Sequence, residues 1–153
     1  GDDTVTGLLR LDGWRQALGE AGLPADHVYI GAVDTPALTA ALKSMLDGPT
    51  PPTAVFSSNA RCTVAILSVL QTLRRKDVAL IGFGDFPTAA VLRPAVTVIH
   101  QDGDAMGQFA ADRLFTRLDH PDRRMRRRTV LPVSLIARTS CAMPGQKSCP
   151  DRK

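Results

Sequence analysis

The sequence predicts an α/β fold with an open, mostly parallel sheet flanked by helices. Segments with helical periodicity alternate along the chain with short apolar runs of strand length. One of these runs, "DVALIGF" at 77–83, is almost continuously apolar, as expected for a strand covered on both faces. Only about five strands are available, too few to close a barrel.

The helices and strands can be placed in order along the chain. Thr4 or Thr6 can cap a first helix that runs to about Ala21, and a following glycine and proline end it. Its apolar residues recur with helical spacing, which gives it one apolar face. The later segments are a strand at 27–31, a helix at 35–46, strands at 53–58 and 77–83 separated by a helix at 59–75, a strand at 96–100, a helix at 102–118 and a last strand at 129–138.

Length and composition limit the class of protein. With 153 residues, 44% of them hydrophobic and 22% charged, the chain can form one domain with a substantial core. No apolar run is long enough to span a membrane. The three cysteines, Cys62, Cys141 and Cys149, form no CxxC pair, which argues against a disulfide framework and a structural zinc site. We expect a cytoplasmic protein without a metal or a cofactor.

A basic run stands out near the end of the predicted 102–118 helix. Seven of the basic residues fall within 113–128, and five of them lie in "RRMRRR" at 123–128. This run follows the turn-like "DHPD", so we interpret it as an exposed, solvated loop. A contact with DNA is the alternative, which the absence of interleaved aromatic residues and of a helix-turn-helix pattern makes less favoured.

The predicted sheet indicates where a ligand site should lie. In open α/β sheets, ligands bind at the carboxyl ends of the strands. Here those ends are Asn59, the "GFGDFP" turn at 82–87 and the residues that follow Ile99.

Four motifs at these places resemble the lactose-repressor (LacI) family of bacterial transcriptional regulators. They are "RLDGWRQAL" at 10–18, "PPTAVFSSN" at 51–59, the long segment from "DVALIGFGDFP" to "LFTRLD" at 77–119, and "TVLPVSLIARTSC" at 129–141. Together they cover roughly Thr6 to Cys141, in the order and at the distances found in the family.

This resemblance implies a two-lobed core like that of periplasmic sugar-binding proteins, which binds an effector between its lobes. The chain resembles only the later part of that core, a C-terminal lobe that is incomplete at its N-terminus. We expect residues 1–141 to form the C-terminal part of an effector-binding and dimerisation domain, and residues 142–153 to be a disordered tail. The helix-turn-helix headpiece and the N-terminal lobe are absent, so an operator would be bound only through the missing headpiece.

The resemblance also implies a set of ligand-binding residues. Arg10 matches the family's effector-contacting arginine, and its planar guanidinium can bind adjacent hydroxyls or a carboxylate. Thr6 lies one helical turn before it on the same face, although a helix cap is an equally good role. Asn59 matches an asparagine at the effector site, which favours a ligand contact, and a helix cap is its alternative role. Gln101 matches the glutamine at the crossing between the lobes.

Two positions depart from the family pattern. The residue after Asn59 is commonly an aspartate and here is Ala60, while the usual pair of aspartates in the next turn is replaced by Gly84 and Asp85. Asp85 remains a candidate ligand residue, with turn formation beside Pro87 as its alternative role. The lost acceptors make an effector other than a plain monosaccharide, or the absence of an effector, conceivable.

A partner surface is also implied by the resemblance. Val64, Val91 and Leu92 match positions at the family's dimer interface. Ordinary core packing is the alternative for each of them. We therefore expect a homodimer, with these three side chains as the candidates for its interface.

The leading function is an effector-sensing module of a repressor that responds to a sugar or a sugar-like small molecule. We do not expect an enzyme, because His100 has no serine, cysteine or carboxylate pair placed around it in a catalytic motif. A periplasmic sugar-binding protein of a transport system and a truncated, non-functional remnant are the alternatives. A nucleotide-dependent enzyme is disfavoured because "GFGDFP" lacks the GxGxxG spacing.

Overall fold

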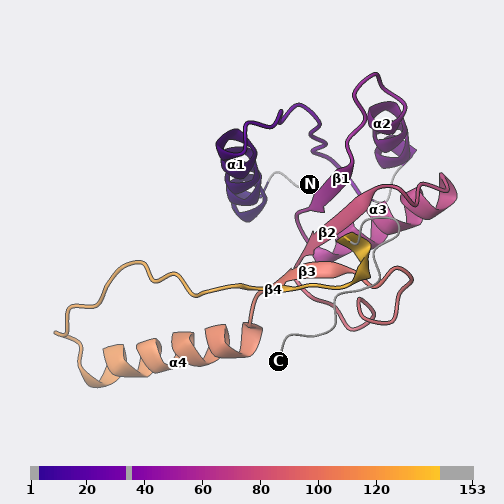
Figure 1. Ribbon diagram of the computed structural model, residues 1–153. Helices are drawn as coiled ribbons and strands as arrows, with labels where there is room; N and C mark the ends of the chain where they lie inside the picture. The colour runs from indigo at the N-terminus through magenta and orange to yellow at the C-terminus, as the bar shows by residue number, and fades with distance from the viewer. Residues whose placement is uncertain (1–3, 34–35, 142–153) are drawn as a thin grey trace.

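A computed structural model describes residues 4–33 and 36–141. Within these residues the elements follow in the order α1 (Val5–Glu20), α2 (Pro36–Leu46), β1 (Ala54–Ser57), α3 (Ala60–Thr72), β2 (Ala79–Phe83), β3 (Thr97–His100), α4 (Gly103–Asp119), β4 (Ser134–Ile136) and a 3-10 helix, η1 (Thr139–Cys141). Figure 1 shows a sheet with α2 and α3 on one side, α1 beside it, and α4 directed away from it. The tail predicted at 142–153 lies outside the described residues.

The four strands form one open sheet in the order β1-β2-β3-β4. β1 pairs with β2 and β2 with β3 in parallel, and β3 pairs with β4 in antiparallel. The parallel pairs bring the carboxyl ends of β1, β2 and β3 to the same edge, with Ser57 opposite Gly82 and Phe83 opposite Ile99. The predicted α/β class with an open, mostly parallel sheet is confirmed.

The core lies between the sheet and the helices α2 and α3. α3 packs directly against β1 and β2, and α2 packs on α3. Gly82 makes this close approach possible, because a Cβ atom there would lie 2.6 Å from Oγ1 of Thr63 on α3. The buried apolar side chains of the core are Leu38, Leu42, Leu46, Ile66, Leu67, Val69, Leu70, Val78, Leu80, Ala89, Val96 and Val98.

Burial alternates along β2, which the sequence did not indicate. Leu80 and Gly82 are buried, whereas Ala79, Ile81 and Phe83 are only half-buried. The uninterrupted apolar run predicted a strand covered on both faces. In the described residues only the face toward α3 is fully covered, and the opposite face leaves Phe83 available at the end of the strand.

The strand predicted at 27–31 is wrong, because these residues form no strand. No neighbouring strand in the described part of the chain pairs with their backbone. Side chains hold the segment instead: a ring nitrogen of His27 lies 2.9 Å from the carbonyl oxygen of Thr50, and the Tyr29 hydroxyl donates to the carbonyl of Ala32. The apolar residues of this segment therefore indicated a strand, but no pairing partner is present for it in the described residues.

The last strand is also shorter than predicted. The sequence indicated a strand at 129–138, but β4 contains only Ser134–Ile136. β3 offers partners to these three residues alone, and Pro132, just before them, has no N–H group to extend the ladder. The segment at 129–133 is consequently free to line a cavity.

The predicted helices are found with small differences at their ends. Thr4, not Thr6, caps α1, since its hydroxyl accepts a hydrogen bond from the amide of Gly7 at 3.1 Å. Gly22 has φ +66, a left-handed conformation that glycine adopts without strain and that ends the helix. The start predicted for the second helix, Thr35, lies outside the described residues. No helix in the described chain combines the length and the apolar character needed to cross a bilayer.

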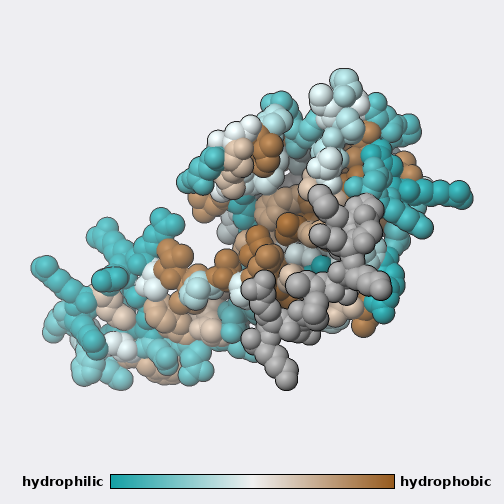
Figure 2. Space-filling view, viewed as in Figure 1, coloured by the Kyte–Doolittle hydropathy of each residue, from teal (hydrophilic) through white to brown (hydrophobic). Residues whose placement is uncertain are grey.

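α4 and the segment after it form an arm that leaves the body of the molecule (Figure 1). Asp102 caps the helix by accepting from the amide of Ala105 at 2.9 Å. None of its residues is buried, and Leu114, Phe115 and Leu118 are all more than half exposed. Figure 2 shows a hollow between this arm and the body, with apolar surface along it.

Candidate functional site

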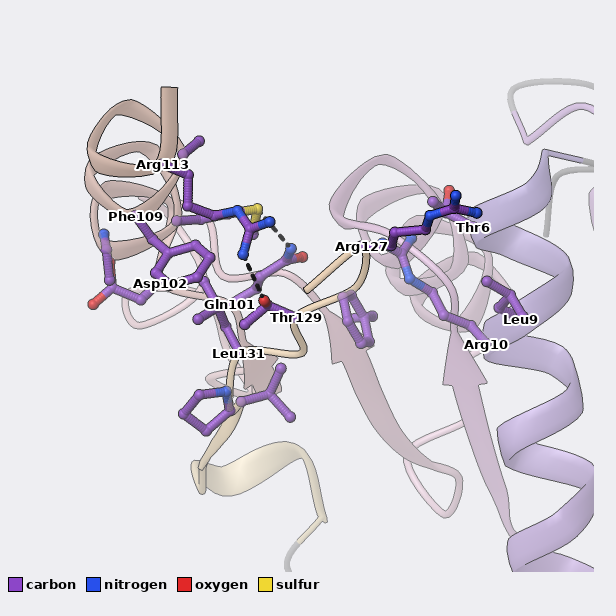
Figure 3. Close-up of a pocket in the computed structure, with 16 residues that line it drawn as sticks. Thr6, Leu9, Arg10, Gln101, Asp102, Phe109, Arg113, Arg127, Thr129 and Leu131 are labelled. Atoms are coloured by element: carbon purple, nitrogen blue, oxygen red, sulfur yellow. Dashed lines mark hydrogen bonds between the residues drawn. The ribbon is translucent and has the colours of Figure 1, made fainter. Parts of the chain in front are cut away.

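A cavity of about 830 Å³ lies between the body of the molecule and the arm. Its walls come from α1, from the ends of β2 and β3, from α4 and from the segment at 127–133. Figure 3 shows Thr6, Leu9 and Arg10 of α1 on one side of it and Phe109 and Arg113 of α4 on the other. The cavity therefore opens at the carboxyl ends of the parallel strands, where the sequence predicted a ligand site.

Two contacts hold Arg10 at the carboxyl ends of β1 and β2. Its guanidinium carbon lies 4.0 Å from the centroid of the Phe83 ring, a cation–π contact. Its Nη1 donates to the carbonyl oxygen of Ser58 at 2.7 Å. Because the planar group is stacked and bonded on one side, it presents its remaining donors in a defined direction. Arg10 is half-buried and lines the cavity, as the sequence predicted.

Thr6 and Gln101 line the same cavity although they lie far apart in the sequence. Thr6 is exposed on α1, and its Oγ1 lies 3.2 Å from that of Thr4. Gln101 follows β3 directly, and its Nε2 makes a long contact of 3.7 Å with the Met106 sulfur. Three of the five predicted ligand residues are thus brought together, each with polar atoms at the cavity wall.

Asn59 lies at the end of β1 but is not part of the cavity wall. Its side-chain oxygen accepts from the amide of Cys62 at 2.8 Å, and so it caps α3. The capping role, which the sequence left open as the alternative, is therefore present. A contact between Asn59 and a ligand stays a prediction.

Asp85 is engaged in an ion pair across the molecule. Both of its carboxylate oxygens accept from the guanidinium of Arg138, at 2.9 and 2.8 Å, and one of them also accepts from the amide of Phe86. The Arg138 guanidinium holds the pKa of Asp85 below its ordinary value, and the Phe86 amide adds to this effect. In this conformation the carboxylate joins the turn after β2 to the segment after β4, and it does not face the cavity.

Gly84, which stands where the family commonly has an aspartate, adopts a backbone conformation that favours glycine. It has φ +84, and nothing lies within 4 Å of the place where a Cβ atom would be. Its amide donates to the carbonyl of Ile99 at 2.8 Å, which ties the end of β2 to β3. The position has space for a side chain, but its backbone conformation suits glycine. At the end of β2 a ligand would therefore meet backbone groups and the Phe83 ring, and no carboxylate.

His100 ends β3, as the sequence predicted. Its Nδ1 is buried and has no hydrogen-bond partner in the described part of the chain.

Several residues of the cavity were not found from the sequence. Phe83 could have been found, because an aromatic residue at a strand end next to a glycine turn is available for stacking. Arg113 and Thr129 could not: they lie 16 residues apart and are joined by a hydrogen bond of 3.2 Å that closes one wall (Figure 3). Arg127 also lines the cavity and comes from the basic run.

The three candidates for a dimer interface differ in exposure. Val64 on α3 is 49% exposed and Val91 is 68% exposed, so neither is explained by core packing. Leu92 is half-buried and packs against the core. Its role as an interface residue and those of the two valines stay predictions.

No metal site is indicated in the described ranges. Groups of three or more histidine, cysteine or acidic side chains that could hold an ion are not found among residues 4–33 and 36–141. The acidic side chain of the cavity wall is Asp102, which already caps α4.

An open, mostly parallel sheet with a polar and aromatic cavity at the carboxyl ends of its parallel strands is the arrangement in which α/β proteins bind small molecules. A model of the periplasmic binding protein-like domain matches residues 2–141. The ribose operon repressor of Escherichia coli (strain K12) is 31% identical over 136 residues, which are 86% of this chain and 41% of that protein. The regulator CelR of Thermobifida fusca is 31% identical over 142 residues, 90% of this chain and 40% of the relative.

Solved structures agree with these sequence matches. A complex of the transcriptional regulator CelR with cellobiose has a TM-score of 0.74 and 32% identity, and the match covers 90% of this chain and 43% of that one. A dimeric Lac repressor with a C-terminal deletion has a TM-score of 0.78 at 24% identity, which shows a shared fold. It covers 93% of this chain and 53% of the repressor.

The chain belongs to the periplasmic binding protein-like domain family, in the branch of the LacI-family regulators. It spans about two fifths of the length of the curated relatives named above, at 41% and 40%.

Proposed function

We propose that this chain is the effector-sensing and dimerisation part of a cytoplasmic LacI-family repressor that responds to a sugar or a sugar-like small molecule. The observation that supports this most directly is the position of Arg10, stacked on Phe83 at the carboxyl ends of the strands and facing the cavity. The names of the relatives agree with it, since one is a ribose operon repressor and another was solved with cellobiose.

The cavity is suited to a polyhydroxylated molecule. Arg10 supplies a rigid set of donors, Thr6 and Gln101 supply groups that both donate and accept, and Phe83 and Phe109 supply flat apolar surface. None of these groups activates a nucleophile or transfers a proton at a reacting centre, so the function is binding and not catalysis.

Binding would act on the angle between the body and the arm. Thr6 and Arg10 belong to the body, whereas Phe109 and Arg113 belong to the arm, so a ligand in the cavity touches both. A ligand that contacts both parts in one arrangement and only one part in another shifts the population toward the first. In a dimer, such a shift is a signal that a DNA-binding headpiece could receive.

The test is calorimetric titration of the chain with ribose, cellobiose, glucose 6-phosphate and gluconate. For any of these four compounds that binds, Arg10→Gln should weaken the affinity about 10- to 100-fold, because hydrogen bonds to a charged group contribute about 1.5–3 kcal/mol each. Arg15→Gln is the matched control, since Arg15 is exposed on the same helix and is not part of the cavity wall. Equal affinities of the two variants, or no binding of any member, would contradict the proposal.

The dimer is tested separately. Sedimentation equilibrium of the chain should show a dimer that Val64→Glu together with Val91→Glu converts to a monomer, because both side chains are exposed and a buried charge without a partner is unfavourable at an interface. A monomeric parent chain would remove dimerisation from the proposed function and leave the effector site untouched.

A further inference from the structure

The net charge of the molecule is concentrated in one place. The chain has nineteen basic and fifteen acidic side chains, a formal net charge of +4. The twelve residues 117–128 contain six arginines and two aspartates, which already gives +4. The remaining residues are therefore balanced, and the positive field of the protein comes from this segment.

We define the basic tip as five arginines that follow the end of α4, namely Arg123, Arg124, Arg126, Arg127 and Arg128. All five are exposed. The segment that carries them follows the far end of α4 in the arm (Figure 1), where Figure 2 shows hydrophilic surface, and Arg127 also lines the cavity.

The side chains of the basic tip have no partner in the described part of the chain. No ion pair and no side-chain hydrogen bond involves them there. Other arginines of the molecule behave differently: Arg75 pairs with Asp77 at 2.9 Å, and Arg138 pairs with Asp85 at 2.8 Å. Five like charges within six residues repel one another over distances shorter than the Debye length of about 8 Å. A polyanion would relieve that repulsion, and the fold does not provide one.

We propose that the basic tip binds the phosphate backbone of double-stranded nucleic acid without reading its sequence. Every cation of the tip is an arginine, whose planar fork matches the oxygens of a phosphate. The tip has no helix and no aromatic side chain that could enter a groove and read bases, so contacts to the backbone are what it can make. This function goes beyond effector sensing and does not depend on it.

An anionic membrane fits the arm less well. Helices that lie on membranes have lysine or arginine on their polar face, next to an apolar face. α4 instead carries three aspartates against two arginines, so its own charge opposes an anionic surface. The segment 123–128, which carries the basic tip, contains a single apolar residue, Met125.

The test is binding of the 153-residue chain to a fluorescein-labelled 30-base-pair duplex of random sequence, measured by anisotropy between 50 and 200 mM NaCl. With five phosphates neutralised, the slope of log K against log [NaCl] should be about −4 to −5, which is a 10²- to 10³-fold loss of affinity over this range. A second duplex of unrelated sequence should bind within about threefold of the first.

Three variants locate the binding. The first variant changes four arginines of the tip to glutamine: Arg123, Arg124, Arg126 and Arg128. Arg127 is kept because it lines the cavity. This variant should reduce the slope to about −1 and the affinity at 50 mM NaCl more than 100-fold. The same four residues changed to lysine should keep the slope within one unit. The matched control removes the same charge elsewhere on the exposed surface, by Arg15, Arg61, Arg74 and Lys76→Gln, and should bind within about threefold of the parent.

Circular dichroism would check that each variant is folded. If the glutamine variant does not fold, the lysine variant and the control variant still test the proposal. The proposal is overturned if the tip variant keeps the parent's slope, or if the tip and control variants lose affinity equally, which would make the effect one of net charge. It is also overturned if vesicles containing 30% phosphatidylserine bind the chain more tightly than the duplex does and the tip variant abolishes that binding.

Discussion

α3 and α4 are built alike but are placed differently. Each follows a parallel strand, each is capped by a side-chain oxygen that accepts from the amide three residues on, and they have 13 and 17 residues. α3 has six buried residues, whereas α4 has none. Local sequence is sufficient to start and end a helix, but burial depends on whether the helix itself packs against the sheet, as α3 does on β1 and β2. Burial in the body, which includes α3, therefore stabilises the fold, whereas α4 in the arm mainly presents exposed side chains.

The largest expected effect comes from one substitution made in both helices. Leu70→Ala on α3 should lower the free energy of unfolding by about 2–5 kcal/mol, because a side chain that is 4% exposed leaves a cavity. Leu118→Ala on α4, where the leucine is 65% exposed, should change it by less than about 0.5 kcal/mol. Urea unfolding followed by circular dichroism measures both. Similar losses in the two variants would mean that α4 is packed in solution.

The second-largest effect concerns the ion pair between Asp85 and Arg138. Asp85→Asn should lower the free energy of unfolding at pH 7 by about 2 kcal/mol, because Arg138, 16% exposed, loses the carboxylate that it grips with two donors. The pKa of Asp85 is lowered in the folded state, so the parent's advantage is fully present above the unfolded-state value of about 3.9. It should disappear as the pH falls through the lower folded-state value.

Urea unfolding of the parent and the variant at pH 7, 4 and 2.5 measures this dependence. An advantage that stays constant down to pH 2.5 would show that the carboxylate does not contribute through its charge.

Two glycines allow a test of opposite sign. Gly82→Ala should destabilise the body by about 1–3 kcal/mol, because the new Cβ would lie 2.6 Å from the Thr63 hydroxyl, which is itself hydrogen-bonded to the Asn59 carbonyl and cannot move freely. Gly107→Ala on α4 meets no atom within 4 Å and should stabilise the helix by about 0.5–1 kcal/mol. Thermal unfolding followed at 222 nm measures both, and a destabilising Gly107→Ala would contradict the description of the arm.

The smallest effect concerns the two caps. Asn59→Ala should lower the global free energy of unfolding by about 1 kcal/mol, since the amide of Cys62 loses its acceptor at the start of a packed helix. Asp102→Ala removes the same kind of bond, but its effect should appear as faster hydrogen exchange in the first turn of α4 and not in global unfolding. Equal changes in global stability would mean that the arm unfolds together with the body.

The sequence predicted most of the local structure correctly because local signals decide it. The cap at Asn59, the stop at Gly22 and the apolar spacing of α2 each depend on residues within a few positions of one another. The strand at 27–31 was predicted wrongly because pairing depends on a neighbour that no local pattern reveals. The alternating burial of β2 has the same origin, since it depends on what covers each face.

The candidate site was predictable only in part. The rule that ligands bind at the carboxyl ends of strands led to Gln101 and the family resemblance led to Arg10, and both line the cavity. The Asp85–Arg138 pair joins residues 53 positions apart, and no spacing in the sequence indicates it. The opposite wall, with Arg113 bonded to Thr129, depends on how the arm folds back and was missed for the same reason.

The short connection between β3 and α4 makes the arm a lever. Only Gln101 and Asp102 separate the two elements, so the base of α4 is fixed to the sheet while its 17 residues extend for about 25 Å. A tilt of roughly 5° at Gln101 would carry the far end of a rod of that length about 2 Å. A small displacement beside the cavity is therefore magnified at the opposite end of the helix.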